Sequence, residues 1–463
     1  MRPVIRLLSL CTVVTLGACT PHEVHTPIPA GGGETFNSFD QDREVALDIL
    51  FVIDDSGSME DEQASLAARF SELSRALEAL PGGLPSVHIG VVSSSVGTAP
   101  FSSSSCPADN DDGRFRIGAR SGSSCQLDAG SRFLVDERLA DGTRKKNYQG
   151  ALDQVFACMA RLGTQGCQFE QHLEAMKRAL SPGLNPDFLR PDSYLVVIVL
   201  ADEDDCSARA GAGLFDPDPA LGGLDSYRCF EHGVVCSESL SRQNPGVKTG
   251  CRSNESSPLS ASVQGYVDFL RGLKGDRVIT AAIVGGAVNV RSQVVDGNAD
   301  LASVCSGNGQ RTARPSVRLA QFIGAFQDAG VVTSICADDF TPALRAIADV
   351  ITRKVASPCV KGEVLQLAPD DPVATPVEGA GVGVWCTVTD VGAGRADDSL
   401  PACADGAGKP CWRAVLDPVK CPAATSPAQL EIQIDREPTQ SVVGLESQVR
   451  CLTPLPGARP TVN

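Results

Sequence analysis

The stretch from Leu47 to Met59 constrains the fold of this chain more than any other. The mostly apolar residues 47–53 are followed abruptly by Asp54-Asp55-Ser56-Gly57-Ser58 and then by a charged, amphipathic segment. The apolar run predicts a buried strand, and open α/β sheets bind ligands beyond the carboxyl ends of their strands. One carboxylate and two hydroxyls at alternate positions suit a hard cation, because Mg²⁺, Ca²⁺ and Mn²⁺ prefer oxygen ligands. Helix capping by Ser56 or Ser58 is the alternative interpretation.

The region up to residue 355 alternates strand and helix patterns. Alternating elements of these lengths predict an α/β fold with a doubly wound, mainly parallel sheet that helices cover on both faces. The predicted strands are 47–53, 87–93, 194–201, 278–284 and 331–335, and the predicted helices are 61–80, 148–162, 170–180, 260–273, 317–329 and 341–355.

Two cysteine-containing insertions and a separate C-terminal region complete the expected organisation. The α/β domain spans 45–356, with insertions at about 96–146, which holds an acidic run at 109–113, and at about 205–258, which is rich in Gly, Pro and Asp. Beyond it, six cysteines and short β-like runs predict a small disulfide-stapled β domain over 357–455. Residues 456–463 form a tail.

The N-terminal residues are typical of an export signal. Arg2 and Arg6 precede an apolar segment, 7–16, that is too short to span a bilayer, and Leu16-Gly17-Ala18-Cys19 follows. These residues resemble a bacterial lipobox, which implies a signal peptide over 1–18 and lipidation of Cys19. Thr20, where inner-membrane lipoproteins often have Asp, favours the outer membrane. An ordinary secretory signal is the alternative. Residues 19–44 are expected to form a flexible tether.

The cysteine count agrees with an oxidising compartment. The chain has 18 cysteines, and 16 remain when Cys11 in the leader and Cys19 are set aside. Disulfides persist in the periplasm and at cell surfaces. Proximity in sequence suggests the pairs Cys106–Cys125, Cys158–Cys167, Cys305–Cys336 and Cys403–Cys411, although spacing alone leaves the connectivity open.

The charge of the chain narrows its partners. The formal net charge is −16 at pH 7, and no basic patch stands out. This argues against nucleic acid as a partner. Membrane association is therefore expected through the lipid anchor alone, and an acidic surface suits a soluble exported domain with a cation site.

Asp54, Ser56 and Ser58 resemble the first metal-binding motif of von Willebrand factor A (VWA) domains. The resemblance implies a VWA/Rossmann-like fold and a metal-ion-dependent adhesion site, at which a carboxylate of a protein partner completes the coordination of Mg²⁺, Mn²⁺ or Ca²⁺. The third loop of that site matches Val199-Leu200-Ala201-Asp202, where Asp202 is the expected water-mediated ligand. Residues 1–355 as a whole resemble secreted bacterial VWA lipoproteins.

The second loop departs from the family pattern. The best register puts Cys167 where VWA domains have a threonine, so we expect Glu170, three residues later, to replace it as a ligand. Thr164 is the alternative. His172 is expected on the surface of the following helix rather than at the metal.

These observations predict a non-enzymatic cell-envelope lipoprotein. It would act as a divalent-cation-dependent binding module for adhesion or assembly, with an acidic side chain of its protein partner at the site. The first alternative is a structural lipoprotein with a degenerate, metal-free site. The second is a metal-assisted hydrolase that uses the acids 202–205, although no nucleophile elbow, zinc motif or phosphate loop is present.

Overall fold

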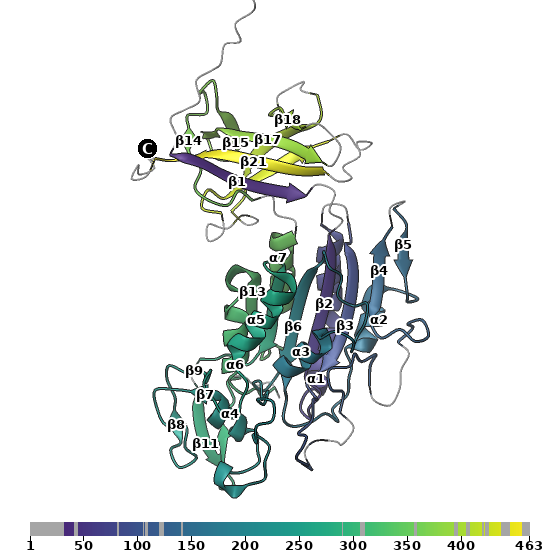
Figure 1. Cartoon of the computed structure of the whole chain (residues 1–463), viewed down its shortest axis with the longest axis vertical. Helices are drawn as coiled ribbons and strands as arrows, with labels where there is room; N and C mark the ends of the chain where they lie inside the picture. The colour runs from purple at the N-terminus through teal and green to yellow at the C-terminus, as the bar shows by residue number, and fades with distance from the viewer. Residues whose placement is uncertain are drawn as a thin grey trace, which may run out of the picture.

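The computed structural model contains an α/β body and a β-rich domain (Figure 1). The structure describes residues 32–40, 45–80, 83–104, 106, 110–119, 125–139, 142–288, 290–305, 311–355, 359–392, 397–403, 408–418, 421, 426–436 and 445–455. The predicted signal peptide, Cys19 and the tail 456–463 lie outside these residues.

The α/β body is built on a seven-stranded sheet, which confirms the α/β class. Its five neighbouring strands from β13 to β3 are parallel, and β4 and β5 continue the sheet antiparallel. The order is β13 (Gly330–Ser334), β10 (Val278–Val284), β6 (Tyr194–Ala201), β2 (Ala46–Ile53), β3 (Ser86–Ser93), β4 (Leu134–Arg138) and β5 (Arg144–Lys146). Residues 134–146 were expected in an insertion, and that expectation is wrong because they pair with the edge of β3.

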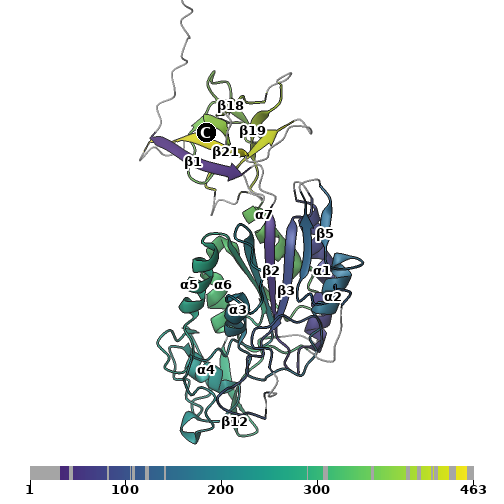
Figure 2. The ribbon, with the colours of Figure 1, turned by 45° about the vertical axis from the view of Figure 1, so that its right-hand side comes forward.

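Helices cover both faces of this sheet (Figure 2). One hydrophobic core lies between the sheet and α1 (Glu60–Glu78), α2 (Leu152–Met159) and α7 (Thr341–Val355). A second core lies between the opposite face and α3 (His172–Leu180), α5 (Val263–Lys274) and α6 (Val317–Gly324). The central strands are buried on both sides, which is why β2 and β6 are almost wholly apolar in sequence.

A lobe of short elements extends beyond the carboxyl ends of the strands (Figure 1). Residues 205–258 supply most of it, as expected for an insertion, and a hairpin after β10 adds the rest. The elements are η1 (Pro219–Leu221), α4 (Tyr227–Gly233), β7 (Val234–Val235), β8 (Gly246–Val247), β9 (Arg252–Ser253), β11 (Arg291–Val295) and β12 (Asn298–Leu301), and η2 (Gln327–Ala329) follows α6.

The β-rich domain lies at the other end of the molecule and has its own core around Trp412 and Val388. One sheet has the order β1-β21-β17-β18 and the other β14-β16-β15-β19-β20. The strands are β1 (Gly33–Asp40), β14 (Gln366–Leu367), β15 (Thr375–Glu378), β16 (Gly383–Val384), β17 (Cys386–Gly392), β18 (Asp398–Leu400), β19 (Cys411–Leu416), β20 (Leu430–Asp435) and β21 (Leu445–Thr453).

Strand β1 corrects the expected tether. Residues 33–40 pair antiparallel with β21 along their whole length, from Gly33 opposite Thr453 to Asp40 opposite Glu446. The segment has a polar sequence, but Thr35 and Asn37 alternate into the domain, and the Asn37 Oδ1 accepts a hydrogen bond from the Lys361 N–H at 2.8 Å. The α/β body is therefore inserted between the first and the later strands of the β-rich domain.

Candidate metal centre

The first loop begins where β2 ends. The Asp54 N–H still donates to the Leu200 carbonyl at 3.0 Å, so Asp54 continues the pairing with β6 and is fully buried. Its Oδ1 accepts the Ser56 N–H at 2.7 Å, which turns the chain back over the strand. The hydroxyl oxygens of Ser56 and Ser58 then lie 3.5 Å apart.

The serines do not cap helix α1. The helix has Met59 at its N-cap position, and no side chain accepts a capping hydrogen bond there. Gln63, in the first turns of α1, instead donates to the Asp54 carbonyl and to the Gly163 carbonyl, both at 2.9 Å. The capping interpretation is therefore wrong.

The third loop brings Asp202 to the same edge of the sheet. Asp202 follows β6, the neighbour of β2, and is 5% exposed. Its Oδ1 and the Oδ2 of Asp54 are both buried, and neither has a hydrogen-bond partner. Buried carboxylate oxygens are rarely left in this state unless an ion or water satisfies them.

The second loop lies against the first. The Gly166 N–H donates to the Asp55 carbonyl at 2.7 Å. The Cys167 N–H donates to the Ser95 hydroxyl at 2.8 Å, and this hydroxyl in turn donates to the Asp55 carboxylate. A Cβ on Gly166 would lie 2.2 Å from that carboxylate, so only glycine fits. Sequence reasoning missed Ser95, although Ser94 and Ser95 directly follow β3 at the same sheet edge.

Cys167 cannot replace the missing threonine hydroxyl, because it forms a disulfide with Cys106. Glu170, the expected replacement, is buried, with 3% of its surface exposed. Its carbonyl accepts the Cys206 N–H at 2.7 Å, which ties the second loop to the third. Thr164 follows Gly163, whose N–H and carbonyl are both bonded to Gln63.

Two of the four expected disulfides are wrong. Cys106 pairs with Cys167 and Cys125 with Cys158, whereas Cys305–Cys336 and Cys403–Cys411 are bonded as expected. Cys106 lies next to Cys167 although 61 residues separate them in the chain, so sequence proximity misleads here. The other four bonds are Cys206–Cys229, Cys236–Cys251, Cys359–Cys421 and Cys386–Cys451.

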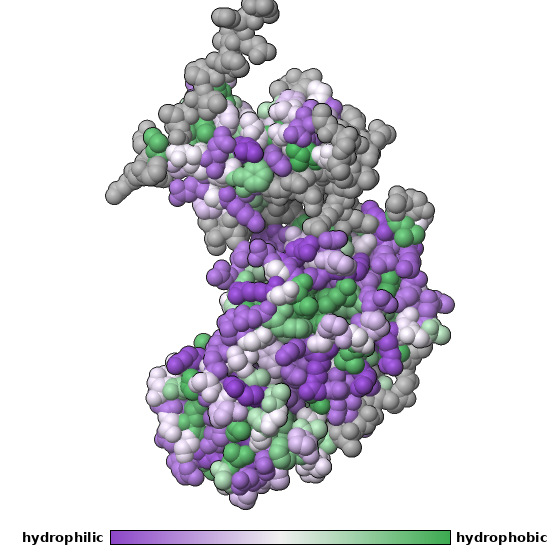
Figure 3. Space-filling model, in the orientation of Figure 1, coloured by the Kyte–Doolittle hydropathy of each residue, from purple (hydrophilic) through white to green (hydrophobic). Residues whose placement is uncertain are grey.

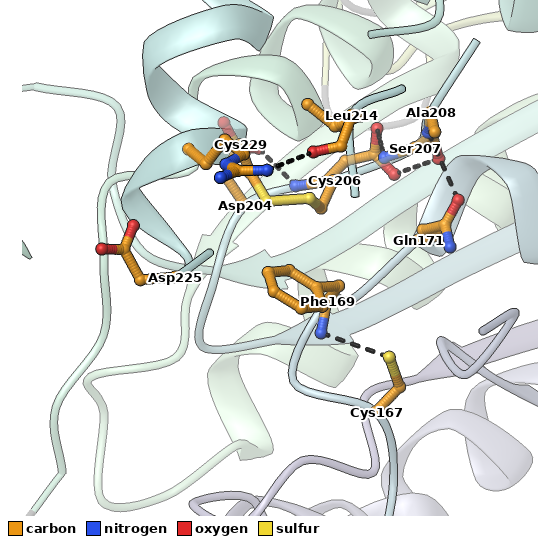
Figure 4. Close-up of a disulfide and its surroundings, with 12 residues drawn as sticks. Cys167, Phe169, Gln171, Asp204, Cys206, Ser207, Ala208, Leu214, Asp225 and Cys229 are labelled. Carbon is orange, nitrogen blue, oxygen red and sulfur yellow. Dashed lines mark hydrogen bonds between the residues drawn. A yellow bond between two sulfur atoms is a disulfide. The ribbon is translucent and has the colours of Figure 1, made fainter. Parts of the chain in front are cut away.

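Two of these disulfides start from the second and third loops. Cys206–Cys229 and Cys106–Cys167 share one small core with Phe169; Figure 4 shows the Cys206–Cys229 bond beside Phe169 and Cys167. This core holds the second and third loops together and joins both to the lobe that contains α4. The positions of the loops therefore depend on packing that involves residues from 106 to 229.

His172 is completely buried, which contradicts its expected place on the helix surface. Its Nε2 lies 3.8 Å from the Asp54 Oδ2, and neither ring nitrogen has a hydrogen-bond partner. Burial lowers the pKa of His172 to about 4, so the ring is neutral at pH 7 and does not offset the charge of Asp54.

Four carboxyl groups crowd one another around the loops. Burial first, and then the Asp202 carboxylate, raise the pKa of Asp54 well above its usual value. Burial and the Glu203 carboxylate, followed by Asp54, do the same for Glu170. Burial also raises the pKa of Asp202, although a hydrogen bond from the Ser58 hydroxyl and the charge of Arg314 partly oppose this shift. Burial, followed by the charge of Asp202, raises the pKa of Glu203 to about 7.

The remaining acids of the third loop have structural partners. Asp204 accepts hydrogen bonds from the Arg318 and Leu319 N–H groups at the start of α6. Asp205 accepts the Leu173 N–H at 2.9 Å and forms a fully buried ion pair with Arg318, also at 2.9 Å. Two of the four acids that the hydrolase alternative would use, Asp204 and Asp205, are thus engaged by the starts of α6 and α3 and by Arg318.

The donors at the site fit a hard divalent cation. All are oxygens, and two of them are buried carboxylate oxygens without a hydrogen-bond partner. In the described residues, three acidic or sulfur ligand atoms come within 4.8 Å of one another only at Cys403, Cys411 and Asp435, where both cysteines are disulfide-bonded. No three carboxylates around Asp54 meet this criterion in the described residues.

The comparisons with known proteins give distant structural matches. No protein-family model matches the chain, and no curated protein does. The pilus adhesin SpaC of Lactobacillus rhamnosus GG matches with a TM-score of 0.33 and 11% identity over 94% of this chain, which spans 43% of that adhesin. A von Willebrand factor type A protein of Catenulispora acidiphila has a TM-score of 0.27 and 12% identity, with 91% of this chain and 66% of that protein covered. BatB of Bacteroides thetaiotaomicron has a TM-score of 0.26 and 11% identity, over 67% and 98% of the two chains.

The sheet itself defines the class of protein. Its central strand β2 ends in the Asp-x-Ser-x-Ser loop, and the adjacent parallel strand β6 ends in the acidic third loop. The chain thus has a VWA-like α/β fold stapled by disulfides.

Hydrophilic residues predominate on the face of this body drawn in Figure 3. Within the described residues, no helix has the length and hydropathy that a membrane span requires.

Proposed function

We propose that this protein is an envelope lipoprotein that binds a protein partner through a divalent cation. Asp54, Ser56, Ser58 and Asp202 hold the cation, and Glu170 supplies the carboxylate of the second loop. The observation that carries the proposal is the pair of buried, unsatisfied oxygens, Asp54 Oδ2 and Asp202 Oδ1, beside two adjacent hydroxyls. A bound cation supplies the positive charge that attracts a partner carboxylate.

The topology supports a ligand at this position. We take the sheet as doubly wound: the chain passes from β2 to β3 on one side and later to β6 on the other, so the strand order reverses between β2 and β6. Ligands of open α/β sheets bind at this reversal, beyond the carboxyl ends of the strands. Asp54 and Asp202 follow the two strands concerned.

The arrangement of the domains suits a surface-presented binding site. The chain enters the described structure at β1, in the β-rich domain, while the candidate site lies at the opposite end of the α/β body. If Cys19 carries a lipid, the site faces away from the membrane and towards a partner. A hydrolase that uses the acids 202–205 is less well supported, since Asp204 and Asp205 are bonded to α6 and Arg318.

The test is a thermal and calorimetric titration of the oxidised chain with Mg²⁺, Mn²⁺ and Ca²⁺. A cation at 100 times its dissociation constant should stabilise the native protein by about 2.7 kcal/mol. Ser58→Ala should abolish the stabilisation that comes from a cation at this site, because the substitution removes a ligand hydroxyl. Ser58 is exposed, so the core is not disturbed. The matched control is Ser399→Ala, an exposed serine of the β-rich domain.

The result also decides between the proposal and its main rival. A wild-type protein that neither binds nor is stabilised by any of the three cations would leave a structural lipoprotein with a degenerate site. Retention of full cation binding by Ser58→Ala would show that the cation binds elsewhere.

A further inference from the structure

Two buried histidines of the α/β body differ in their hydrogen bonding. His88 contacts the Phe188 carbonyl at 2.8 Å and the Glu137 carboxylate at 2.9 Å, so both of its ring nitrogens have partners. His172, at the start of α3, is completely buried, and no described residue forms a hydrogen bond with either of its ring nitrogens. Buried polar atoms of native proteins are rarely left in this state, so an ion or a water is the expected partner of this ring.

The side chain that His172 faces is Asp54. The Asp54 Oδ1 accepts the Ser56 N–H at 2.7 Å and the Ser94 hydroxyl at 3.5 Å. The Asp54 Oδ2 has no hydrogen-bond partner among the described residues, and it lies 3.8 Å from the Nε2 of His172. This separation exceeds the range of about 2.7–3.2 Å that an N–H···O hydrogen bond requires, so the two side chains do not satisfy each other.

The same separation suits two ligands of one metal ion. Imidazole nitrogens and carboxylate oxygens bind Zn²⁺ at about 2.0–2.2 Å, which places two ligands of one ion roughly 3–4 Å apart. In the described part of the chain, no third carboxylate or imidazole lies within 4.8 Å of both atoms. The hydroxyls of Ser56 and Ser58, together with water, are therefore expected to complete the coordination.

We propose that His172 is a nitrogen ligand of the metal centre and binds the same ion as the Asp54 carboxylate, so that the resident cation is a transition-metal ion. This inference rests on the proposed function, to which it adds the class of metal. A site of oxygen donors alone accepts Mg²⁺ and Ca²⁺, whereas an imidazole in the set favours transition metals such as Co²⁺ and Zn²⁺. His172 adds this donor five residues after Cys167, which is disulfide-bonded and cannot serve as a ligand.

The direct test is pulsed electron paramagnetic resonance of Mn²⁺ bound to the oxidised chain. A histidine nitrogen on Mn²⁺ modulates the electron spin echo, and labelling the histidines with ¹⁵N should shift the modulation frequencies. The wild type should show this histidine signal, and His172→Gln should lose it. A wild-type spectrum of bound Mn²⁺ without a histidine signal would overturn the inference, whether or not the variant folds.

Calorimetric titration with Co²⁺ and with Mg²⁺ gives a second readout. His172→Gln should weaken Co²⁺ binding by at least about tenfold, the loss that outer-shell substitutions at metal sites already cause, and should leave Mg²⁺ binding nearly unchanged. His232→Gln is the matched control, since this histidine belongs to α4 in the lobe and its substitution should change neither affinity. Equal losses of Co²⁺ and Mg²⁺ binding in His172→Gln would mean that the ring only packs against the site, and would overturn its role as a ligand.

The outcomes separate this inference from the proposed function. Mn²⁺ binding that Ser58→Ala abolishes, without a histidine signal in the wild type, would overturn the role of His172 and leave the proposed function standing. A histidine signal that His172→Gln loses and Ser58→Ala keeps would support His172 as a ligand and overturn the hydroxyl-containing site of the proposed function. A wild type that binds none of these cations would overturn both.

Discussion

At the scale of single residues, the third loop divides its acids between two tasks. Asp202 and Glu203 face other carboxylates, whereas Asp204 and Asp205 hold the starts of α6 and α3. Sequence reasoning could recognise an acidic loop after a buried strand. It could not assign the individual acids, because Arg318, the partner of Asp205, lies 113 residues further along the chain.

Arg318 provides a test of this division. We expect Arg318→Met to lower the free energy of unfolding by about 3–5 kcal/mol, because it leaves Asp205 buried without a counter-charge. Arg345→Met is the matched control, since its ion pair with Glu72 is exposed and should contribute less than about 1 kcal/mol. Urea denaturation of both variants measures the difference. Equal losses would mean that the buried pair has no special role.

At the scale of elements, a polar cluster joins β3, β4 and the segment before β6. His88 in β3 contacts the Phe188 carbonyl through Nδ1 at 2.8 Å and the Glu137 carboxylate of β4 through Nε2 at 2.9 Å. Lys145 of β5 donates to the same carboxylate at 3.3 Å. This cluster links the strands β4 and β5, which were expected in an insertion, to β3.

Glu137 makes the cluster sensitive to pH. Burial raises the pKa of Glu137, but hydrogen bonds from His88 and Lys145 outweigh it, so the pKa falls below its usual value of 4.5. A lowered carboxyl pKa stabilises the fold above pH 4.5, and that stability is lost as the pH falls through the folded-state pKa.

We therefore expect Glu137→Gln to lower the free energy of unfolding by about 1–2 kcal/mol at pH 7 and to have little effect near pH 3. Urea denaturation at the two pH values measures this, with the exposed substitution Glu363→Gln as control. A loss of the same size at both pH values would mean that shape rather than charge matters at residue 137.

At the scale of the whole molecule, the α/β body and the β-rich domain have separate cores. We expect Val388→Asp, which buries a carboxylate in the β-rich core, to destabilise that domain by at least about 3 kcal/mol. Cation binding by the α/β body should be unchanged. Differential scanning calorimetry with and without cation checks both points.

The adjacent Thr389→Asp is the control, because its side chain alternates to the less buried face of β17. The separation of the two cores would be contradicted if Val388→Asp also lowered the transition of the α/β body or abolished cation binding.

The sequence by itself determined the features that depend on neighbouring residues. The wholly apolar strands, the polar loop after β2, the helical periodicities and the oxidised cysteine pool are all local or compositional properties, and they predicted the α/β class. They also predicted that Asp54 and Asp202 follow the ends of buried strands, which the structure places side by side in the sheet.

Tertiary structure alone decided which distant residues meet. The pairing of β1 with β21 spans some four hundred residues, Cys106 reaches Cys167 across the second loop, and Glu170 lines a cavity completed by α4 and β12. No local pattern encodes these contacts, because each depends on the packing of the sheet, the helices and the lobe at the same time. The burial of His172 follows from the same packing, since helix α3 lies over the end of β2.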